Sequence, residues 1–252
     1  MRAVYESLEV VITLRCNGRC RNCIRLCNRP DFGLDYSDMD MAWSDVSTVI
    51  EDLRRVSEVT GRPAVETLCF TGGEPLLHEL LPSFVRAAVD ALEEPGIVEG
   101  VVVNSNRTLP IPAEIEKRVV HWWSLREKAQ MHQCALVSPS DPPDGFPRQG
   151  GRTWEGCQHF RRNRIVVTRH GYQLCCAAEG YTRLMGLGEL YVPRLPETLA
   201  GFPRPDAVCD HCAFGAPVAF PEAAYGCPVS PVFLREAEKN RAGRRIGRRL
   251  GG

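Results

Sequence analysis

The chain has 252 residues, of which 44% are hydrophobic and 25% are charged, and its formal net charge is zero. This length and composition are typical of a globular protein with a large core, and the charge balance favours neither nucleic acid nor a membrane surface as a partner. The chain has no apolar run of about 18 residues and no signal-peptide pattern, so we expect a cytoplasmic protein. Twelve cysteines in such a chain indicate metal or redox chemistry rather than a disulfide framework.

The first half of the chain alternates between predicted strands and helices. Short apolar, β-branched runs predict buried strands, and apolar residues at helical spacing, such as Val46, Val49 and Ile50, predict helices between them. We expect strands over Leu8–Leu14, Ala64–Phe70, Val98–Val103 and Cys134–Val137, and helices that end at Gly61, span Glu79–Leu92 and span Ala113–Lys128. This alternation is typical of βαβ units with a parallel sheet, so the predicted fold class is α/β.

The second half begins with a linker rich in proline and turn residues over 138–147. Beyond it, Arg164–Thr168 and Tyr172–Cys176 predict a β-hairpin. We therefore expect an α/β unit over residues 1–140, a smaller unit around the hairpin over 141–230, and a basic C-terminal helix or tail over 231–252.

Three cysteines, Cys16, Cys20 and Cys23, directly follow the first predicted strand with the spacing C-x3-C-x2-C. Soft thiolates are the ligands of iron–sulfur clusters, and three of them leave one iron of a [4Fe–4S] cluster without a protein ligand. Two alternatives remain. One is a structural zinc loop, and the other is a closed ferredoxin-like cluster with Cys27 as its fourth ligand.

This cysteine loop, together with Thr71-Gly72-Gly73-Glu74-Pro75 after the second strand, resembles the radical S-adenosylmethionine (radical SAM) superfamily. The resemblance implies a partial (β/α) TIM-like barrel and S-adenosylmethionine (SAM) bound at the open iron. It also implies that the methionine amino group meets the glycine-rich turn, where glycines permit close approach and the carboxylate attracts an ammonium. The SAM-contacting residues that it implies are Gly72, Gly73, Glu74, Pro75, Asn104, Asn106 and Ser138.

A second set of cysteines, Cys157, Cys175, Cys209 and Cys212, surrounds the predicted hairpin. From the residues alone, a zinc site is one interpretation. The arrangement also resembles the twitch domain of some radical SAM enzymes, a short relative of the SPASM domain. That resemblance implies a C-terminal twitch-like β-hairpin/helix domain with a second, fully ligated [4Fe–4S] cluster suited to electron transfer.

The resemblance further implies an enzyme that generates a 5′-deoxyadenosyl radical from SAM and removes a hydrogen atom from its substrate. We expect net dehydrogenation of a small sugar- or aminocyclitol-like molecule, with an external electron donor such as flavodoxin or ferredoxin. Alternatives are an epimerase in which Cys176 or Cys227 returns a hydrogen atom, a peptide-modifying maturase, and an iron–sulfur electron-transfer or scaffold protein without catalysis. The chain begins almost at its first strand, which disfavours the maturase.

Overall fold

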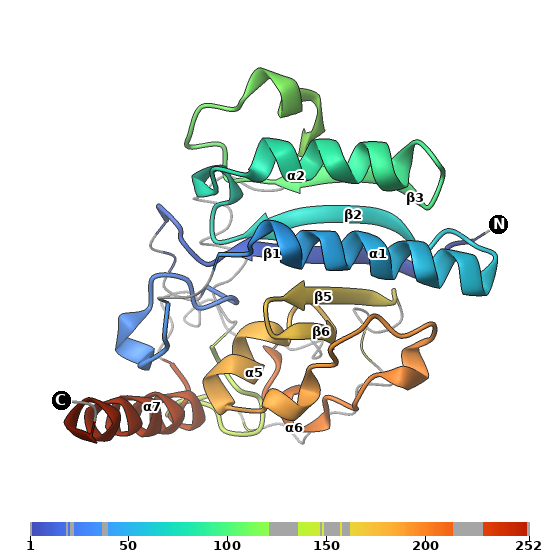
Figure 1. Cartoon of the computed structure of the whole chain (residues 1–252). Helices are drawn as coiled ribbons and strands as arrows, with labels where there is room; N and C mark the ends of the chain where they lie inside the picture. The colour runs from blue at the N-terminus through green and yellow to red at the C-terminus, as the bar shows by residue number, and fades with distance from the viewer. Residues whose placement is uncertain are drawn as a thin grey trace.

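The computed structural model describes residues 2–18, 20, 23–36, 40–120, 136–146, 148, 157, 162–213 and 229–250, with side chains up to residue 243 in the last segment. Its centre is a six-stranded sheet in the order β4-β3-β2-β1-β5-β6 (Figure 1). The strands are β1 (Tyr5–Thr13), β2 (Val65–Gly72), β3 (Val98–Asn104), β4 (Val119–Val120), β5 (Arg164–Thr168) and β6 (Gly171–Leu174). All neighbours are parallel except β5 and β6, which form the predicted hairpin.

Helices α1 (Trp43–Thr60) and α2 (Leu81–Ala88) cover one face of this sheet (Figure 1). The α1 helix ends where predicted, because Gly61 adopts the left-handed conformation that glycine tolerates best. A five-residue π-helical turn, Val89–Glu93, extends α2 to the end expected from the sequence. The predicted parallel α/β architecture is therefore confirmed.

Side chains along each strand alternate between two environments, as the period of two in a strand requires. Leu8, Val10 and Ile12 of β1 pack in the main core with α1 and α2. Val11 packs on the opposite face, with Val166 of β5. We call this opposite face, away from α1 and α2, the inner face of the sheet.

The C-terminal half adds α5 (Glu179–Met185), α6 (Asp206–Cys209) and α7 (Pro231–Leu250) (Figure 1). These helices share a second core with the segment that follows the first cysteine loop. In this core the rings of Tyr181 and Phe233 stack with centroids 5.3 Å apart. The remaining short elements are the 3-10 turns Pro30–Phe32, Pro75–Leu77, Ala113–Arg118, Gly188–Leu190 and Leu199–Gly201.

Two sequence predictions in the middle of the chain are wrong within the described residues. The segment expected as a helix is a 3-10 turn over Ala113–Arg118, and it leads directly into β4. The spacing of Ile115 and Val119 fits a helix, but Val119 reaches the core from a strand paired with Val103. The predicted fourth strand is also not formed at residues 136 and 137, while its residues 134 and 135 lie outside the described residues.

The hairpin does not begin a separate sheet. Its first strand, β5, lies parallel to β1, with Leu8 opposite Ile165 and Val10 opposite Val167. The main core accordingly includes Ile165, Val167 and Tyr172 beside the residues of β1 and β2. The sheet thus continues across residue 140, and the division into domains there remains a prediction.

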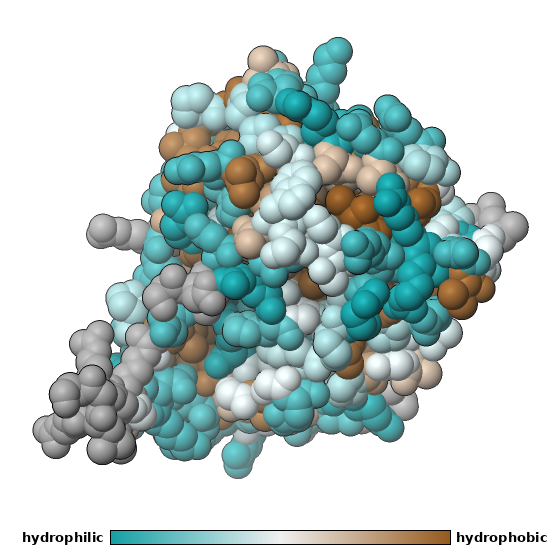
Figure 2. Space-filling model, viewed as in Figure 1, coloured by the Kyte–Doolittle hydropathy of each residue, from teal (hydrophilic) through white to brown (hydrophobic). Residues whose placement is uncertain are grey.

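Exposed apolar side chains are scattered over the described surface. Trp43, Val59, Leu80 and Leu234 are the large hydrophobic residues exposed there. Figure 2 shows hydrophilic residues over most of the visible face, with apolar residues in smaller patches. In the described part of the chain, no helix has both the length and the apolar character needed to cross a membrane.

Candidate active site

The first cysteine loop leaves the carboxyl end of β1. Cys16, Cys20 and Cys23 are each partly exposed, so their thiols are neither buried in the core nor free in solvent. Backbone bonds shape the loop: the Cys23 amide donates to the Cys20 carbonyl at 3.3 Å, and the Gly18 amide donates to the Cys16 thiol at 3.3 Å. The Asn28 side-chain amide donates to the Gly18 carbonyl at 3.1 Å and also to the Cys16 carbonyl, closing the loop.

The thiols of Cys20 and Cys23 lie close enough to Cys16 to affect its titration. Burial raises the pKa of Cys16, and the charges of Cys23 and Cys20 raise it further. A hydrogen bond from the Cys27 thiol lowers the pKa of Cys23 to about 6. The bond from Cys27 therefore favours the thiolate of Cys23, which is the form that binds metal. A cluster that brings positive iron to this loop fits such a set of mutually repelling sulfurs.

The glycine-rich turn after β2 lies directly against this loop. The Gly73 amide donates to the Thr13 carbonyl and the Glu74 amide to the Arg15 carbonyl, both at 2.8 Å. A Cβ on Gly73 would overlap the Arg15 carbonyl oxygen and lie 3.0 Å from the Cβ of Cys16. The absence of a side chain at Gly73 thus lets the loops that follow β1 and β2 contact each other. This contact between loops is sufficient to explain the glycine, without the approach of a ligand.

The Glu74 carboxylate joins the loops that follow β2 and β3. It is fully buried and accepts hydrogen bonds from the Ser105 hydroxyl at 2.7 Å, the Asn106 amide at 2.8 Å and the Leu76 amide at 3.1 Å. The Asn106 side chain in turn donates to Asn17 of the cysteine loop at 2.9 Å. Three loops at the carboxyl ends of three neighbouring strands are thereby tied together, which is where parallel α/β proteins build their sites.

The remaining predicted SAM contacts separate into two places. Asn104 ends β3, and its side-chain oxygen is buried without a hydrogen-bond partner, which leaves an acceptor available to a ligand. Ser138 is fully buried and its hydroxyl lies 2.9 Å from Nδ1 of His211, which stands between Cys209 and Cys212 of the second cysteine set. Its contacts therefore connect Ser138 to the second set and do not bring it to the β2 and β3 loops.

The structure brings the second set of cysteines together. Burial raises the pKa of Cys175, and the charges of Cys212, Cys157 and Cys209 raise it further. Burial and the charges of Cys212 and Cys157 likewise raise the pKa of Cys209 to about 12. Cys175 holds a left-handed backbone (φ 76°), which is strained for a residue with a side chain and turns the chain out of β6. Neighbouring thiols that raise the pKa of Cys175 and Cys209 fit a site in which a bound metal cluster compensates the charge of the thiolates.

The other predicted cysteines have different positions. Cys176 is buried on the inner face of the sheet, in a small cluster with Cys27, Val11 and Val166. Cys16 and Cys23 pack against this same cluster. Cys227 lies outside the described residues. Among the described residues, no three His, Cys, Asp or Glu side chains form a group that fits a single metal ion.

Sequence reasoning missed a buried ionic group beside the cysteine loop. Arg25 pairs with Glu9 of β1 and lies 3.9 Å from Glu179 of α5, and Arg183 bonds Glu179 at 2.7 Å. The side chains of Arg25, Glu179 and Arg183 are all at least nine-tenths buried. A charged residue, Glu9, within an apolar strand was the one signal in the sequence. Its partners lie too far along the chain to be found by spacing.

Known proteins similar to this chain match it over part of its length. No protein-family model matches the chain. The chain is similar to GTP 3',8-cyclase of Staphylococcus epidermidis, with 32% identity over 94 residues, which are 36% of this chain and 26% of that protein. It is also similar to GTP 3',8-cyclase of Acidothermus cellulolyticus, with 34% identity over 85 residues, which are 34% of this chain and 22% of that protein. The match spans about a quarter of the length of these relatives.

Among solved structures, Streptococcus suis SuiB bound to the precursor peptide SuiA aligns with 47% of this chain and 24% of its own. The TM-score is 0.31 and the sequence identity is 13%. The sequence matches to the cyclases are accompanied by a three-cysteine loop that the fold sets against a Gly-Gly-Glu-Pro turn. The chain is thus similar to GTP 3',8-cyclases over about a third of its length.

Proposed function

We propose that the chain is a radical SAM enzyme whose Cys16, Cys20 and Cys23 hold a [4Fe–4S] cluster with SAM at its open iron. The observation that carries this proposal is the direct contact between the cysteine loop and the turn containing Gly73 and Glu74. When bound, the cluster and SAM supply a 5′-deoxyadenosyl radical after one-electron reduction, and that radical removes a hydrogen atom from the substrate. An external donor such as flavodoxin or ferredoxin provides the electron.

The residues of this chain hold and orient SAM in the proposal. The Asn104 side-chain oxygen, buried and without a partner, accepts a hydrogen bond from a ribose hydroxyl or the ammonium. The Glu74 carboxylate attracts the ammonium through its negative charge while keeping its bonds to Ser105 and Asn106. Asn106 positions the cysteine loop through Asn17. Ser138 has no part in this proposal because its contacts lie elsewhere.

In the proposal, the second cysteine set determines that the reaction is an oxidation. Cys157, Cys175, Cys209 and Cys212 hold a second [4Fe–4S] cluster that is fully ligated, which suits it to electron transfer rather than SAM binding. Such a cluster would supply an acceptor for one electron, so that an alcohol carbon that also loses one hydrogen atom and one proton would become a carbonyl. The substrate is a small sugar- or aminocyclitol-like molecule, and the reaction is a net dehydrogenation.

Replacing Cys16, Cys20 and Cys23 together by alanine is expected to abolish SAM cleavage, because the proposed open iron loses its support. Methionine and 5′-deoxyadenosine formed from SAM under a chemical reductant provide the measurement. Cys27→Ala is the control, since Cys27 bonds Cys23 but is not a ligand in the proposal. If Cys27→Ala instead loses the first cluster, the closed ferredoxin-like site is the correct interpretation.

A second candidate function is an epimerase, and the position of Cys176 favours it. Its thiol is buried on the inner face with Val11, beside the cysteine loop, so it is placed to return a hydrogen atom to a substrate radical. The bond from sulfur to hydrogen breaks and a new carbon–hydrogen bond forms. The resulting sulfur radical then takes up one electron and one proton from the reductant.

The two functions differ in the product. We expect a dehydrogenase product lighter than the substrate by the mass of two hydrogen atoms, with no deuterium at the reacting carbon when the reaction runs in D2O. An epimerase product would keep the substrate mass in ordinary water and carry deuterium at the inverted carbon in D2O. Deuterium incorporation that disappears in Cys176→Ala, without any oxidised product, would reverse our preference.

A further inference from the structure

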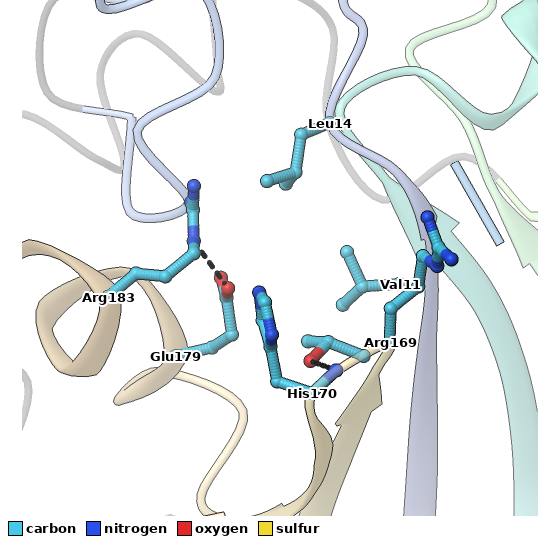
Figure 3. Close-up of a pocket in the computed structure, with 7 residues that line it drawn as sticks. Val11, Leu14, Arg169, His170, Glu179 and Arg183 are labelled. Carbon is cyan, nitrogen blue, oxygen red and sulfur yellow. Dashed lines mark hydrogen bonds and ion pairs between the residues drawn. The ribbon is translucent and has the colours of Figure 1, made fainter. Parts of the chain in front are cut away.

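The first cysteine loop is anchored at both of its ends. Leu14, just before the loop, is buried on the inner face beside a cavity of about 10 Å³, which has room for about one water molecule (Figure 3). The ion pair of Glu179 and Arg183 lines the same cavity. After the loop, the Asn28 side chain binds two of its carbonyls. Asn17, between these anchors, is exposed and bonds instead to the loop that follows β3.

Three side chains form a closed ring of hydrogen bonds between the cysteine loop and the loop that follows β3. The Asn106 side-chain amide donates to the Asn17 side-chain oxygen at 2.9 Å. The Asn17 amide donates to the Thr108 hydroxyl, and this hydroxyl donates to the Asn106 side-chain oxygen, both at 2.5 Å. Because each group donates to the next, the three bonds strengthen one another.

The direction of this ring is fixed by the backbone. The Thr108 backbone amide donates to the Asn106 side-chain oxygen at 2.9 Å, and a backbone amide can only donate. The amino group of Asn106 must therefore face Asn17, and the amino group of Asn17 must face the Thr108 hydroxyl. A hydroxyl can accept one bond and donate another, so the ring requires serine or threonine at position 108.

The ring is attached to the buried part of the molecule. Asn106 is only 4% exposed, so both ends of its side-chain amide need partners, and the ring provides them. Arg107 has a left-handed backbone (φ 54°), which is unfavourable for a residue with a side chain. Its guanidinium donates to the Val119 carbonyl of β4 at 2.6 Å. This bond holds the turn that brings Thr108 back toward the cysteine loop.

We propose that Thr108 is a positioning residue for the first cysteine loop, because its hydroxyl closes the ring that holds Asn17 beside Cys16. The inference rests on the proposed function for its link to SAM. Asn104, a proposed SAM contact, begins the same loop as Thr108, so the ring fixes this contact relative to the proposed cluster site. A site that is already ordered loses less freedom on binding, so the ring should tighten SAM binding.

The first test needs no cluster and measures hydrogen–deuterium exchange of residues 16–18 in the full chain by mass spectrometry. Thr108→Val keeps the shape of the side chain without the hydroxyl, and exchange should be about fivefold faster, the factor that one ordinary hydrogen bond supplies. Thr108→Ser keeps the hydroxyl and should restore the wild-type rate. Thr48→Val is the matched control, because Thr48 is also exposed and its hydroxyl bonds the Ser44 carbonyl within α1 at 3.0 Å. Unchanged exchange in Thr108→Val, or no rescue by serine, overturns the proposal.

The second test measures SAM binding by the reduced chain with its clusters reconstituted, through the change that SAM causes in the electron paramagnetic resonance spectrum. Thr108→Val should bind SAM about fivefold more weakly, and Thr108→Ser should bind it as the wild type does. Iron content and the urea midpoint of Thr108→Val should equal those of Thr48→Val, since each variant loses one exposed hydroxyl and keeps every thiol. A lower iron content and midpoint than in Thr48→Val would indicate a merely structural role and overturn the proposal.

A double variant tests whether Thr108 acts through Asn17. Asn17→Ala should weaken SAM binding as much as Thr108→Val, and the double variant no more than either, because both changes break the same ring. Additive effects overturn the proposal. If SAM causes no spectral change in the wild type, the proposed function fails, while the exchange of residues 16–18 still tests the ring. Equal SAM binding by the wild type and Thr108→Val contradicts the positioning role alone.

Discussion

Gly73→Ala is expected to prevent iron binding at the proposed site of Cys16, Cys20 and Cys23. The new Cβ would overlap the Arg15 carbonyl oxygen and lie 2.7 Å from its carbonyl carbon, and neither atom can rotate away because both belong to the backbone. The Glu74–Arg15 backbone hydrogen bond would break and the cysteine loop would move away from β2. We expect a loss of about 3 kcal/mol or more in the free energy of unfolding, since overpacked sites without freedom to relax lie at the high end of such effects.

Iron per chain after reconstitution, together with a urea unfolding curve, measures this effect. Gly188→Ala is the matched control, because nothing lies within 4 Å of a Cβ placed there. It should keep both its iron and its unfolding midpoint. Full iron content in Gly73→Ala would show that iron binding by the first cysteine loop does not require the contact between the two loops.

Gly180→Ala is expected to destabilise the protein although alanine is the better helix former. Gly180 lies in α5, where exchange for alanine in a free helix would stabilise by about 1 kcal/mol. Here the Cβ would overlap the Ile24 carbonyl oxygen and lie 3.3 Å from Cα of Arg25, just after the cysteine loop. The cost of this overlap is larger than the gain in helix propensity, because α5 must move away from this segment by about the width of a methyl group.

The sign of the change in unfolding free energy of Gly180→Ala shows whether the overlap or the helix propensity is the larger effect. Gly243 in α7 provides the control, since it is also a helical glycine and a Cβ there would meet nothing within 4 Å. Gly243→Ala should raise the stability by about 0.5–1 kcal/mol, while Gly180→Ala lowers it by about 2 kcal/mol. An increase for Gly180→Ala would mean that α5 and the cysteine loop are not in the tight contact described above.

Much of the fold could be predicted because its signals are local. The β1, β2 and β3 strands follow short β-branched runs, and the β5–β6 hairpin follows two such runs around His170 and Gly171. The first cysteine loop could be located for the same reason, since Cys16, Cys20 and Cys23 lie close together in the sequence. The glycine-rich turn was found too, although its backbone bonds to Thr13 and Arg15 could not be predicted from the sequence.

The remainder depends on contacts between distant segments. No local pattern tells that β5 will lie parallel to β1, because both read simply as buried strands. The two-residue strand Val119–Val120 is too short to show the alternation of buried and exposed side chains that marks a strand. Its residues were therefore predicted as part of a helix. Likewise, the pairing of Arg25 with Glu9 and Glu179 joins three separate elements, and Ser138 reaches His211 across the C-terminal half.

The place of β1 between β2 and β5 has a consequence for synthesis on the ribosome. The β2 strand emerges soon after β1, but β5 and α5 emerge much later, so one edge of β1 stays open and Ile24 lacks its neighbour Gly180 in the meantime. The cysteine thiols are then accessible to oxidants and the open edge to other chains. Insertion of the proposed iron–sulfur cluster at Cys16, Cys20 and Cys23 should therefore follow the arrival of α5, as a late step of maturation, and should not guide the folding of the chain's first half.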